Sequence, residues 1–198
     1  MMSKAWAVLV IPACLLIALA AESSIHDGFK SGVFEPPRAA PGFALPGSNG
    51  SVVALSAFRG KVVALAFGFS HCPKICPVTL AKLAEVSQRL GPSAKDLQVV
   101  FVTVDPERDD PARLRTFVGY FNPAFVGATG SQAELKALHR AYGVTATRVA
   151  SENKALGYEV HHSSSIYLID REGKLRVLVP FGKSADDILH DVRLLLDS

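Results

Sequence analysis

Cysteine is scarce in this sequence, and neither sign of charge is in strong excess. The 198-residue chain has three cysteines, too few for the disulfide framework of a small secreted domain, and only Cys72 and Cys76 lie where a folded domain is expected. Lys and Arg total 21 against 18 Asp and Glu, and no basic stretch is interleaved with aromatic side chains. Nucleic acid is therefore not expected as a partner.

One domain with an amino-terminal appendage accounts for the chain. Internal repeats and low-complexity tracts are absent, and 49% of the residues are hydrophobic, which is enough for one full core. The appendage contains an uncharged stretch from Ala5 to Ala21, which Lys4 precedes and Glu22 follows. This charge order is typical of a chain inserted with its amino end in the cytoplasm, so the rest of the chain is expected to be exported.

The uncharged stretch fits two interpretations, a membrane anchor and a cleaved signal peptide. Its length is at the lower limit for a helix that spans a bilayer, about 17–25 residues, while Ala18-Leu19-Ala20 would serve as a small-residue cleavage site. Cys14 within it is interpreted as an inert membrane cysteine, with lipid attachment as the alternative. The short export signal favours a bacterial cell envelope, with the domain on the periplasmic face, membrane-anchored or secreted.

Three segments follow from this pattern. Residues 1–21 are predicted to be the signal peptide or anchor, and the polar, proline-containing residues 22–40 are predicted to be a flexible tether. Residues 41–198 are predicted to form the functional domain. Within this domain, the runs 62–67 and 97–104 are short, apolar and rich in Val, as in strands that are covered on both faces.

Helix signals alternate with these strands. Helical spacing of apolar residues, together with capping and stop residues, predicts helices over 77–90, 111–122, 131–143 and 184–196. The turn-forming residues 170–174 predict a hairpin between strands 166–169 and 175–179. This order predicts an α/β domain in which a central mixed sheet is flanked by helices.

The cysteine pair lies in the sequence FSHCPKICP, residues 69–77, directly after the first buried strand. Pro77 lacks a backbone donor and is best tolerated in a first helical turn, so the helix is expected to begin there, with Cys76 at its start and Cys72 in the preceding loop. The positive end of the helix dipole favours thiolates and lowers the thiol pKa below its free value of about 8.5. A reactive pair is preferred over a structural disulfide, because closing so short a loop adds little stability.

A metal held by two thiolates alone would be under-coordinated, so a third ligand is expected at a nearby strand end. His161 and His162 directly precede the predicted hairpin and are the candidates. His71 adjoins a cysteine and is expected to tune it. The remaining histidines are expected to be structural or solvated: His26, His139 and His190.

Three motifs together resemble the SCO/SenC proteins of cytochrome c oxidase assembly. They are residues 67–77 (GFSHCPKIC between Phe67 and Pro77), Thr103 to Asp109 (TVDPERD), and His162 five residues before Tyr167. The resemblance covers roughly residue 41 to the carboxyl end and implies a thioredoxin-like fold held at the membrane by an amino-terminal segment.

The resemblance also implies one copper ion bound by Cys72, Cys76 and His162, whereas His161 does not match the ligand position. It implies a copper chaperone that helps to mature the binuclear copper centre of oxidase subunit II, with other copper chaperones or thiol reductants as further partners. Two thiolates and an imidazole suit Cu(I) and can hold Cu(II), although zinc could compete for the same donors. Lys74 departs from the family, where an acidic residue is frequent.

A thiol-disulfide oxidoreductase that reduces the acceptor cysteines is the main alternative, so an enzymatic role stays open. Thioredoxin-like reductants usually have two residues between their cysteines and a proline before the later strand. This chain has three residues between Cys72 and Cys76 and has Ser164 at the proline position. Asp105 and Asp110 are expected to end a strand and to cap a helix, and Asp105 could add charge near the thiols.

Overall fold

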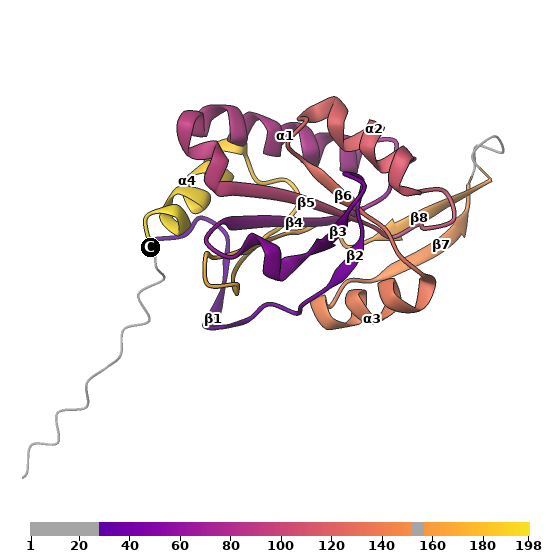
Figure 1. Ribbon diagram of the computed structural model, residues 1–198, viewed down its shortest axis with the longest axis horizontal. Helices are drawn as coiled ribbons and strands as arrows, with labels where there is room; N and C mark the ends of the chain where they lie inside the picture. The colour runs from indigo at the N-terminus through magenta and orange to yellow at the C-terminus, as the bar shows by residue number, and fades with distance from the viewer. Residues whose placement is uncertain (1–27, 152–156) are drawn as a thin grey trace, which may run out of the picture.

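The computed structural model describes residues 28–151 and 157–198. Its elements alternate between strands and helices along most of the chain (Figure 1). In order they are β1 (Gly32–Ala39), β2 (Ala44–Pro46), β3 (Val52–Ala54), the 3-10 helix η1 (Leu55–Phe58), β4 (Val62–Gly68), α1 (Ile75–Leu90), the 3-10 helix η2 (Gly91–Asp96), β5 (Leu97–Thr103), α2 (Pro111–Phe121), β6 (Val126–Ala128), α3 (Gln132–Tyr142), β7 (Ala146–Ala150), β8 (Tyr158–His162), β9 (Ile166–Ile169), β10 (Lys174–Val179) and α4 (Ala185–Leu196).

A mixed sheet forms the centre of the domain, with strand order β1-β10-β9-β4-β5-β6. Strands β4, β5 and β6 are parallel, while β9 runs antiparallel to β4 and β10 antiparallel to β9. All seven residues of β4 are buried, as the apolar run predicted. Two further strand pairs, β2–β3 and β7–β8, lie outside this sheet.

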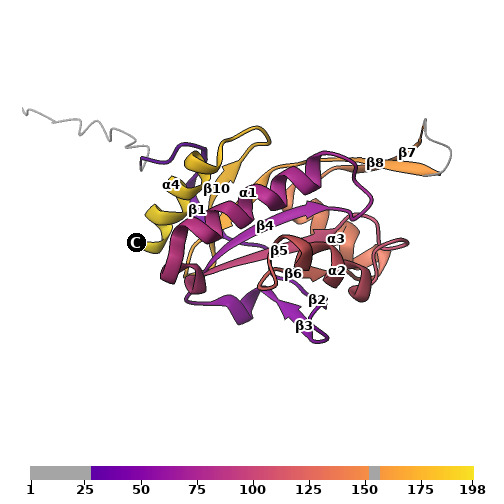
Figure 2. The same cartoon turned by 90° about the horizontal axis from the view of Figure 1, so that it is seen from above.

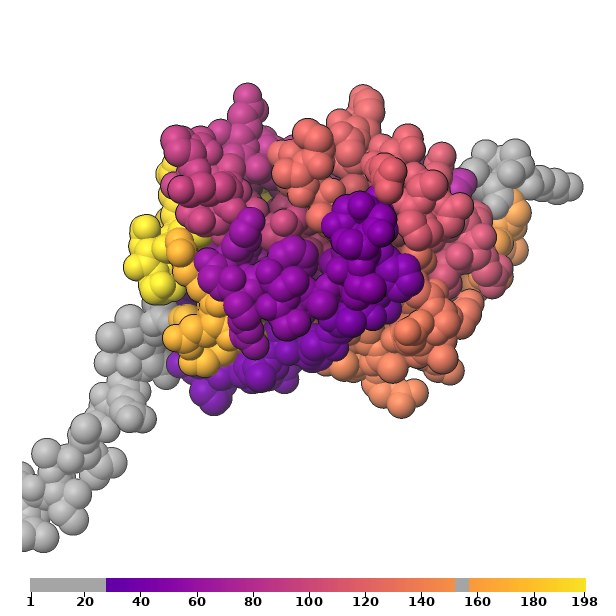
Figure 3. All heavy atoms as spheres, in the orientation of Figure 1, coloured from indigo at the N-terminus to yellow at the C-terminus, as the bar shows by residue number. Residues whose placement is uncertain are grey.

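Helices cover both faces of the sheet. On one face, α1, α2 and α4 pack their apolar side chains against alternate residues of β4 and β5. On the other face, α3 and the segment from β2 to η1 pack against the intervening residues, such as Leu65 and Val100. Figure 2 shows α1 lying along one face of the sheet, and Figure 3 shows the β2–β3 segment, in purple, in front of the sheet. The predicted mixed α/β architecture is confirmed.

The predicted helix boundaries hold where a capping residue determines them. Asp110 accepts a hydrogen bond from the Arg113 backbone N–H at 2.7 Å and caps α2. Ser131 forms the expected capping box with Glu134 at the start of α3, and Gly143 ends that helix with a left-handed φ of 69°. The hairpin of β9 and β10 is also present as predicted.

The predicted tether is partly wrong, because its second half belongs to the sheet. Residues Gly32–Ala39 form β1, which pairs antiparallel with β10 at the edge of the sheet. The register shifts between Val33 and Arg38, around the adjacent Pro36 and Pro37. Prolines are tolerated on an edge strand with a bulge because the missing N–H donors face solvent, and their presence hid this strand.

Two other differences concern the segments that carry the site. Helix α1 begins at Ile75, two residues before the predicted start, so that Pro77 is its third residue. A first helical turn leaves its N–H groups without intrahelical acceptors, so proline is tolerated there as well. The hairpin of β7 and β8 was not predicted, because both strands are short, β7 is almost wholly exposed, and neither strand contains a run of apolar residues.

The amino-terminal predictions concern residues outside the described part of the chain. The stretch Ala5 to Ala21, Cys14 and His26 all fall there. Among the residues that the structure describes, no helix has both the length and the apolar character needed to span a bilayer.

We expect that Gly68→Ala lowers the free energy of unfolding by about 1–3 kcal/mol, the usual cost of overpacking a core. A Cβ atom at this position would lie 2.5 Å from Cys76 Sγ and 2.8 Å from the Phe101 ring. Urea unfolding of the reduced protein measures the change. Gly119→Ala is the control, because a Cβ there meets nothing within 4 Å and alanine favours the helix. Equal stability of the two variants would contradict the close packing at Gly68.

Candidate metal centre

Strand pairing brings three loops to one edge of the sheet. Strands β4 and β5 are parallel, so the loops that follow Gly68 and Thr103 leave the sheet on the same side. Strand β9 runs antiparallel to β4, with Ile166 opposite Ala66, so the segment that leads into β9 arrives at that side too. The cysteine loop, the acidic loop after β5 and the end of β8 therefore meet.

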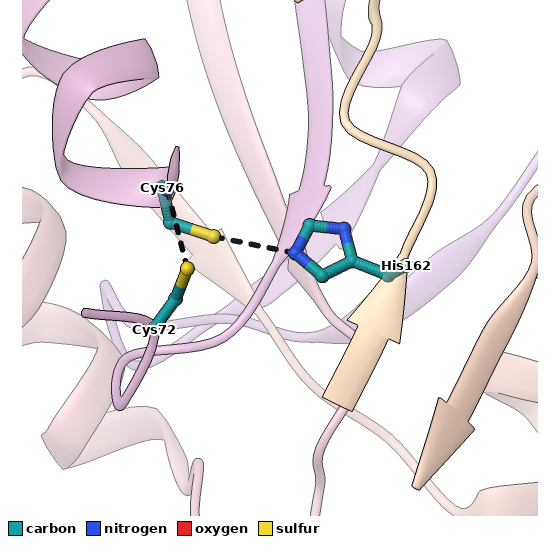
Figure 4. Close-up of side chains that lie close together, drawn as sticks. All are labelled: Cys72, Cys76 and His162. Atoms are coloured by element: carbon teal, nitrogen blue, oxygen red, sulfur yellow. Dashed lines mark hydrogen bonds between the residues drawn. The ribbon is translucent and has the colours of Figure 1, made fainter. Parts of the chain in front are cut away.

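Cys72, Cys76 and His162 converge at this edge (Figure 4). Their ligand atoms all lie within 4.8 Å of one another, and Cys76 Sγ is 3.5 Å from His162 Nε2. Metal bonds of about 2.0–2.3 Å in a planar three-coordinate site would hold the ligand atoms about 3.5–4 Å apart. The cluster is thus close to the size that one metal ion needs.

The ring of His162 is oriented before any metal arrives. Its Nδ1 donates a hydrogen bond to the backbone oxygen of Ser163 at 2.8 Å, which leaves the lone pair of Nε2 facing the sulfurs. The ring also packs edge-on against Phe69, with 5.8 Å between centroids. The imidazole held in this way presents Nε2 as a nitrogen ligand on the side of the cysteine sulfurs.

The two cysteines are in unequal environments, contrary to the expectation that the helix dipole favours both thiolates. Cys72 is half-buried, and its sulfur accepts a hydrogen bond from the Cys76 backbone N–H at 3.5 Å. The side-chain hydrogen bond from Cys76 lowers the pKa of Cys72 well below its ordinary value. The same bond raises the pKa of the Cys76 thiol, as does burial of that side chain. We therefore expect the pair to share one proton, with Cys72 as the thiolate and the Cys76 thiol as its hydrogen-bond donor.

A buried carboxylate that the sequence did not single out supports the cysteine loop. Asp109 is fully buried, and its oxygens accept hydrogen bonds from Ser70 N at 2.9 Å, Ser70 Oγ at 2.6 Å and Thr103 Oγ1 at 2.7 Å. Ser70 stands two residues before Cys72, so the bonds tie the loop to the end of β5. The signal that was available was a second acidic residue after a strand that ends beside the cysteines.

Asp105 is buried as well, but it faces the β7–β8 hairpin. Its carboxylate accepts hydrogen bonds from Arg108 Nε and from the Tyr158 hydroxyl. Neither oxygen belongs to the cluster of possible metal ligands. Its interactions are with the loop and the hairpin, which agrees with the structural role expected for this stretch.

The other histidines within the described residues lie apart from the cluster. His71 points to Ser70 Oγ at 3.1 Å, and the exposed His161 is not among the clustered ligands. His139 packs on Phe67, and burial lowers its pKa. His190 faces the Gly28 backbone oxygen at 3.0 Å.

This arrangement supports two kinds of chemistry. Two sulfurs and one imidazole nitrogen form a donor set that suits a soft metal ion such as Cu(I). A thiolate with a partner thiol close by can also attack a disulfide and then close its own. The roles of Cys72, Cys76 and His162 in either reaction stay predictions at this point.

Residues 34–197 match the family model SCO1/SenC. A SCO2-like protein of Rickettsia felis is 36% identical over 132 residues, which are 67% of this chain and 64% of that protein. The mitochondrial SCO2 homologue of Bos taurus is 37% identical over 153 residues, covering 76% of this chain and 57% of that protein. The chain thus spans less than two thirds of the length of these relatives.

Solved structures agree with this match. ScoI of Bradyrhizobium japonicum with copper bound is 30% identical, with a TM-score of 0.72, and the alignment covers 80% of this chain and 99% of that one. Yeast Sco1 with copper bound is 31% identical, with a TM-score of 0.71, and the alignment covers 82% of this chain and 90% of that one. The thioredoxin-like fold that the motifs implied is therefore shown.

We expect iodoacetamide to alkylate Cys72 before Cys76 in the reduced, metal-free protein. The thiolate is the reacting form, and the lowered pKa of Cys72 keeps it present as the pH falls below about 8.5, where an ordinary thiol slows tenfold per pH unit. The rate at Cys72 should thus stay nearly constant between pH 8 and pH 6. Mass spectrometry of peptides measures both sites and separates them from Cys14.

Cys76→Ala is the control for this experiment, since it removes the hydrogen-bond donor that stabilises the Cys72 thiolate. In this variant the rate at Cys72 should fall with decreasing pH. An intact protein that already shows this fall would contradict the shared-proton arrangement.

Proposed function

The chain belongs to the SCO1/SenC family, and we propose that it is a copper chaperone that assists maturation of the binuclear copper centre of cytochrome c oxidase. The observation that carries the proposal is the convergence of Cys72, Cys76 and His162, whose ligand atoms lie within 4.8 Å of one another. The relatives described with copper bound share the fold of this chain. Copper is here the cargo, held by two sulfurs and one nitrogen.

The donor set supports both uptake and release. Thiolates prefer Cu(I), and the added imidazole allows the same site to hold Cu(II), so a change in redox state does not require different ligands. Three protein ligands leave a coordination position through which an acceptor can approach. A cavity of about 330 Å³ opens beside Cys72 and His162, lined by Phe69, Pro73 and Ile75 among others. An acceptor ligand could enter there while Cys76 stays buried.

A second candidate function, reduction of the acceptor's disulfide, is favoured by the inequality of the two thiols. The half-buried Cys72 thiolate would attack one sulfur of the disulfide and release the other as a thiolate. Cys76 would then attack Cys72 in the mixed disulfide, freeing the second acceptor thiol. Two electrons pass to the acceptor, whose sulfurs take up two protons, one released by the Cys76 thiol and one from water, and a Cys72–Cys76 disulfide remains in this chain.

The partners and the location belong to the same proposal. Subunit II of the oxidase would be the acceptor, and other copper chaperones or thiol reductants would load or reduce the site. The domain would lie on the periplasmic face of a bacterial envelope, held by or released from the segment of residues 1–21. The charge order around Ala5 to Ala21 supports this orientation.

The reduced protein should bind one Cu(I) per chain, measured by competition with a chromogenic chelator. Cys72→Ser, Cys76→Ser and His162→Ala should each weaken binding by at least about tenfold, because each removes one ligand. His161→Ala is the matched control, since this exposed neighbour lies outside the cluster and its loss should leave affinity unchanged. Full affinity in the Cys72→Ser or His162→Ala protein would rule out the proposed ligand set.

Two assays with the isolated subunit II domain as the acceptor distinguish the two candidate functions. We expect copper-loaded protein to transfer its ion to prereduced acceptor, as followed by the absorption of the acceptor's copper centre. In a parallel reaction, metal-free reduced protein is mixed with the acceptor in its disulfide form, and the free thiols that form on the acceptor are quantified. Rapid reduction combined with weak copper binding would favour the oxidoreductase over the chaperone.

A further inference from the structure

The strand that carries His162 is not part of the central sheet. Within the described residues, β8 pairs only with β7, and the two strands form a separate hairpin that projects from the body in Figures 1 and 2. At its base, Ser163 N donates to Thr145 O at 3.0 Å, which closes the hairpin on itself. An isolated two-stranded hairpin is at best marginally stable. The place of His162 therefore depends on what holds the hairpin to the body.

Tyr158 begins β8 and lies on the same face of the strand as His162, because side chains alternate along a strand. Its ring lies between two guanidinium groups, with Arg108 at 3.8 Å and Arg148 at 3.9 Å from the ring centroid. Both distances are well inside the range of a cation–π interaction. Arg148 comes from β7, whereas Arg108 comes from the loop after β5.

The hydroxyl and the backbone of Tyr158 are held by the same loop. The hydroxyl donates a hydrogen bond to Asp105 Oδ1 at 2.7 Å, and Asp105 is 1% exposed. Arg108 donates through Nε to the other oxygen of Asp105 and through Nη1 to the Tyr158 backbone oxygen at 3.1 Å. The ring, hydroxyl and carbonyl of Tyr158 thus all contact the loop after β5. The start of that loop is held by a hydrogen bond from Asp105 N to Thr103 Oγ1 at 2.9 Å.

A second contact path joins this cluster to His162. The guanidinium of Arg108 lies 5.6 Å from the ring centroid of Phe69, and the Phe69 ring packs edge-on against His162 at 5.8 Å. Arg108 therefore contacts the start of β8 directly and its end through Phe69. The two ends of the strand are located against the same part of the body.

We propose that Tyr158 is a positioning residue for the metal centre: clamped between Arg108 and Arg148 and bonded to Asp105, it holds β8 so that His162 stays within reach of the cysteine sulfurs. This inference rests on the proposed copper function and specifies how the third ligand is preorganised. Loss of the clamp leaves the cysteine pair in place but frees the imidazole to move away with its hairpin.

The test compares Tyr158→Leu with Tyr158→Phe. Tyr158→Leu removes both the ring and the hydroxyl and should weaken Cu(I) binding about tenfold, the lower limit for residues that orient metal ligands. Tyr158→Phe keeps the stacked ring and should restore part of the affinity. Tyr120→Leu is the matched control, since this tyrosine is 86% exposed on α2 and should have no effect. Thermal unfolding shows whether each variant is folded.

The His162→Ala background separates positioning from general damage. If Tyr158 acts through His162, Tyr158→Leu has no further effect on Cu(I) affinity in that background. An equal loss in both backgrounds, or no loss in the intact protein, would overturn the proposal. In the intact protein, the electron paramagnetic resonance of bound Cu(II) should lose its nitrogen coupling when the clamp is removed.

A measurement on the metal-free protein tests the positioning role of Tyr158 independently of copper binding. In the reduced, metal-free protein, the nuclear Overhauser effect between the Phe69 and His162 rings should disappear in Tyr158→Leu and persist in Tyr120→Leu. Its persistence in Tyr158→Leu refutes the positioning role. A protein that binds no Cu(I) at all refutes the copper function, while this ring contact still decides whether Tyr158 locates His162.

Discussion

Backbone pairing on both sides of β4 is the constraint on which the rest of the site depends. The parallel ladder to β5 and the antiparallel ladder to β9 fix where three loops leave the sheet. Burial of every residue of β4 leaves no freedom to change this register, since a shift by one residue would turn each side chain to the other face. Cys76 and His162 are 86 residues apart in the sequence, Cys72 lies still further from His162, and the sheet brings the three together.

The close packing at the end of β4 explains why the two cysteines differ. Helix α1 starts so near the strand that Cys76 Sγ lies against Gly68, and the residue Cys76 is 2% exposed. Cys72 precedes the helix and keeps access to the cavity beside it. The buried thiol can then serve as a hydrogen-bond donor and the accessible sulfur as the thiolate. A helix dipole acting alone would have treated both sulfurs alike.

Apolar periodicity and capping residues were sufficient to predict the central elements. The buried strands β4 and β5, the capped helices α2 and α3 and the β9–β10 hairpin all carry a local signal. Strand β1 contains adjacent prolines, and β7 and β8 are short strands without an apolar run, so neither region carries a clear strand signal. Their pairing depends on tertiary contacts, such as the register with β10, which a local pattern does not contain.

The candidate ligands could be named from their motifs, but their support could not. Asp109, which supports the cysteine loop, lies 37 residues after Cys72 in the sequence, and Tyr158 lies four residues before His162. Only the folded chain shows which carboxylate accepts hydrogen bonds from the cysteine loop and which from Tyr158. Asp105 and Asp109 are both buried and both follow β5, yet one bonds to the hairpin and the other to the cysteine loop. The two carboxylates have different partners because a turn separates the two residues, in which Asp109 N donates a hydrogen bond to Asp105 O at 3.0 Å.

The two proposed functions would use the same two sulfurs, so metal binding and thiol exchange would exclude each other. A disulfide needs the sulfurs about 2.05 Å apart and leaves no thiolate, whereas a bound ion holds them about 3.5–4 Å apart. His162 would act as a ligand only in the metal-bound form, because a disulfide offers its Nε2 no partner ion. Hydrogen bonds of Tyr158 attach the hairpin that carries His162 to the loop after β5, which lies outside the segment from Cys72 to Cys76. On this proposal His162 would keep its place while the cysteine pair changes its oxidation state, and the reduced site would take up an ion without rearranging its third ligand.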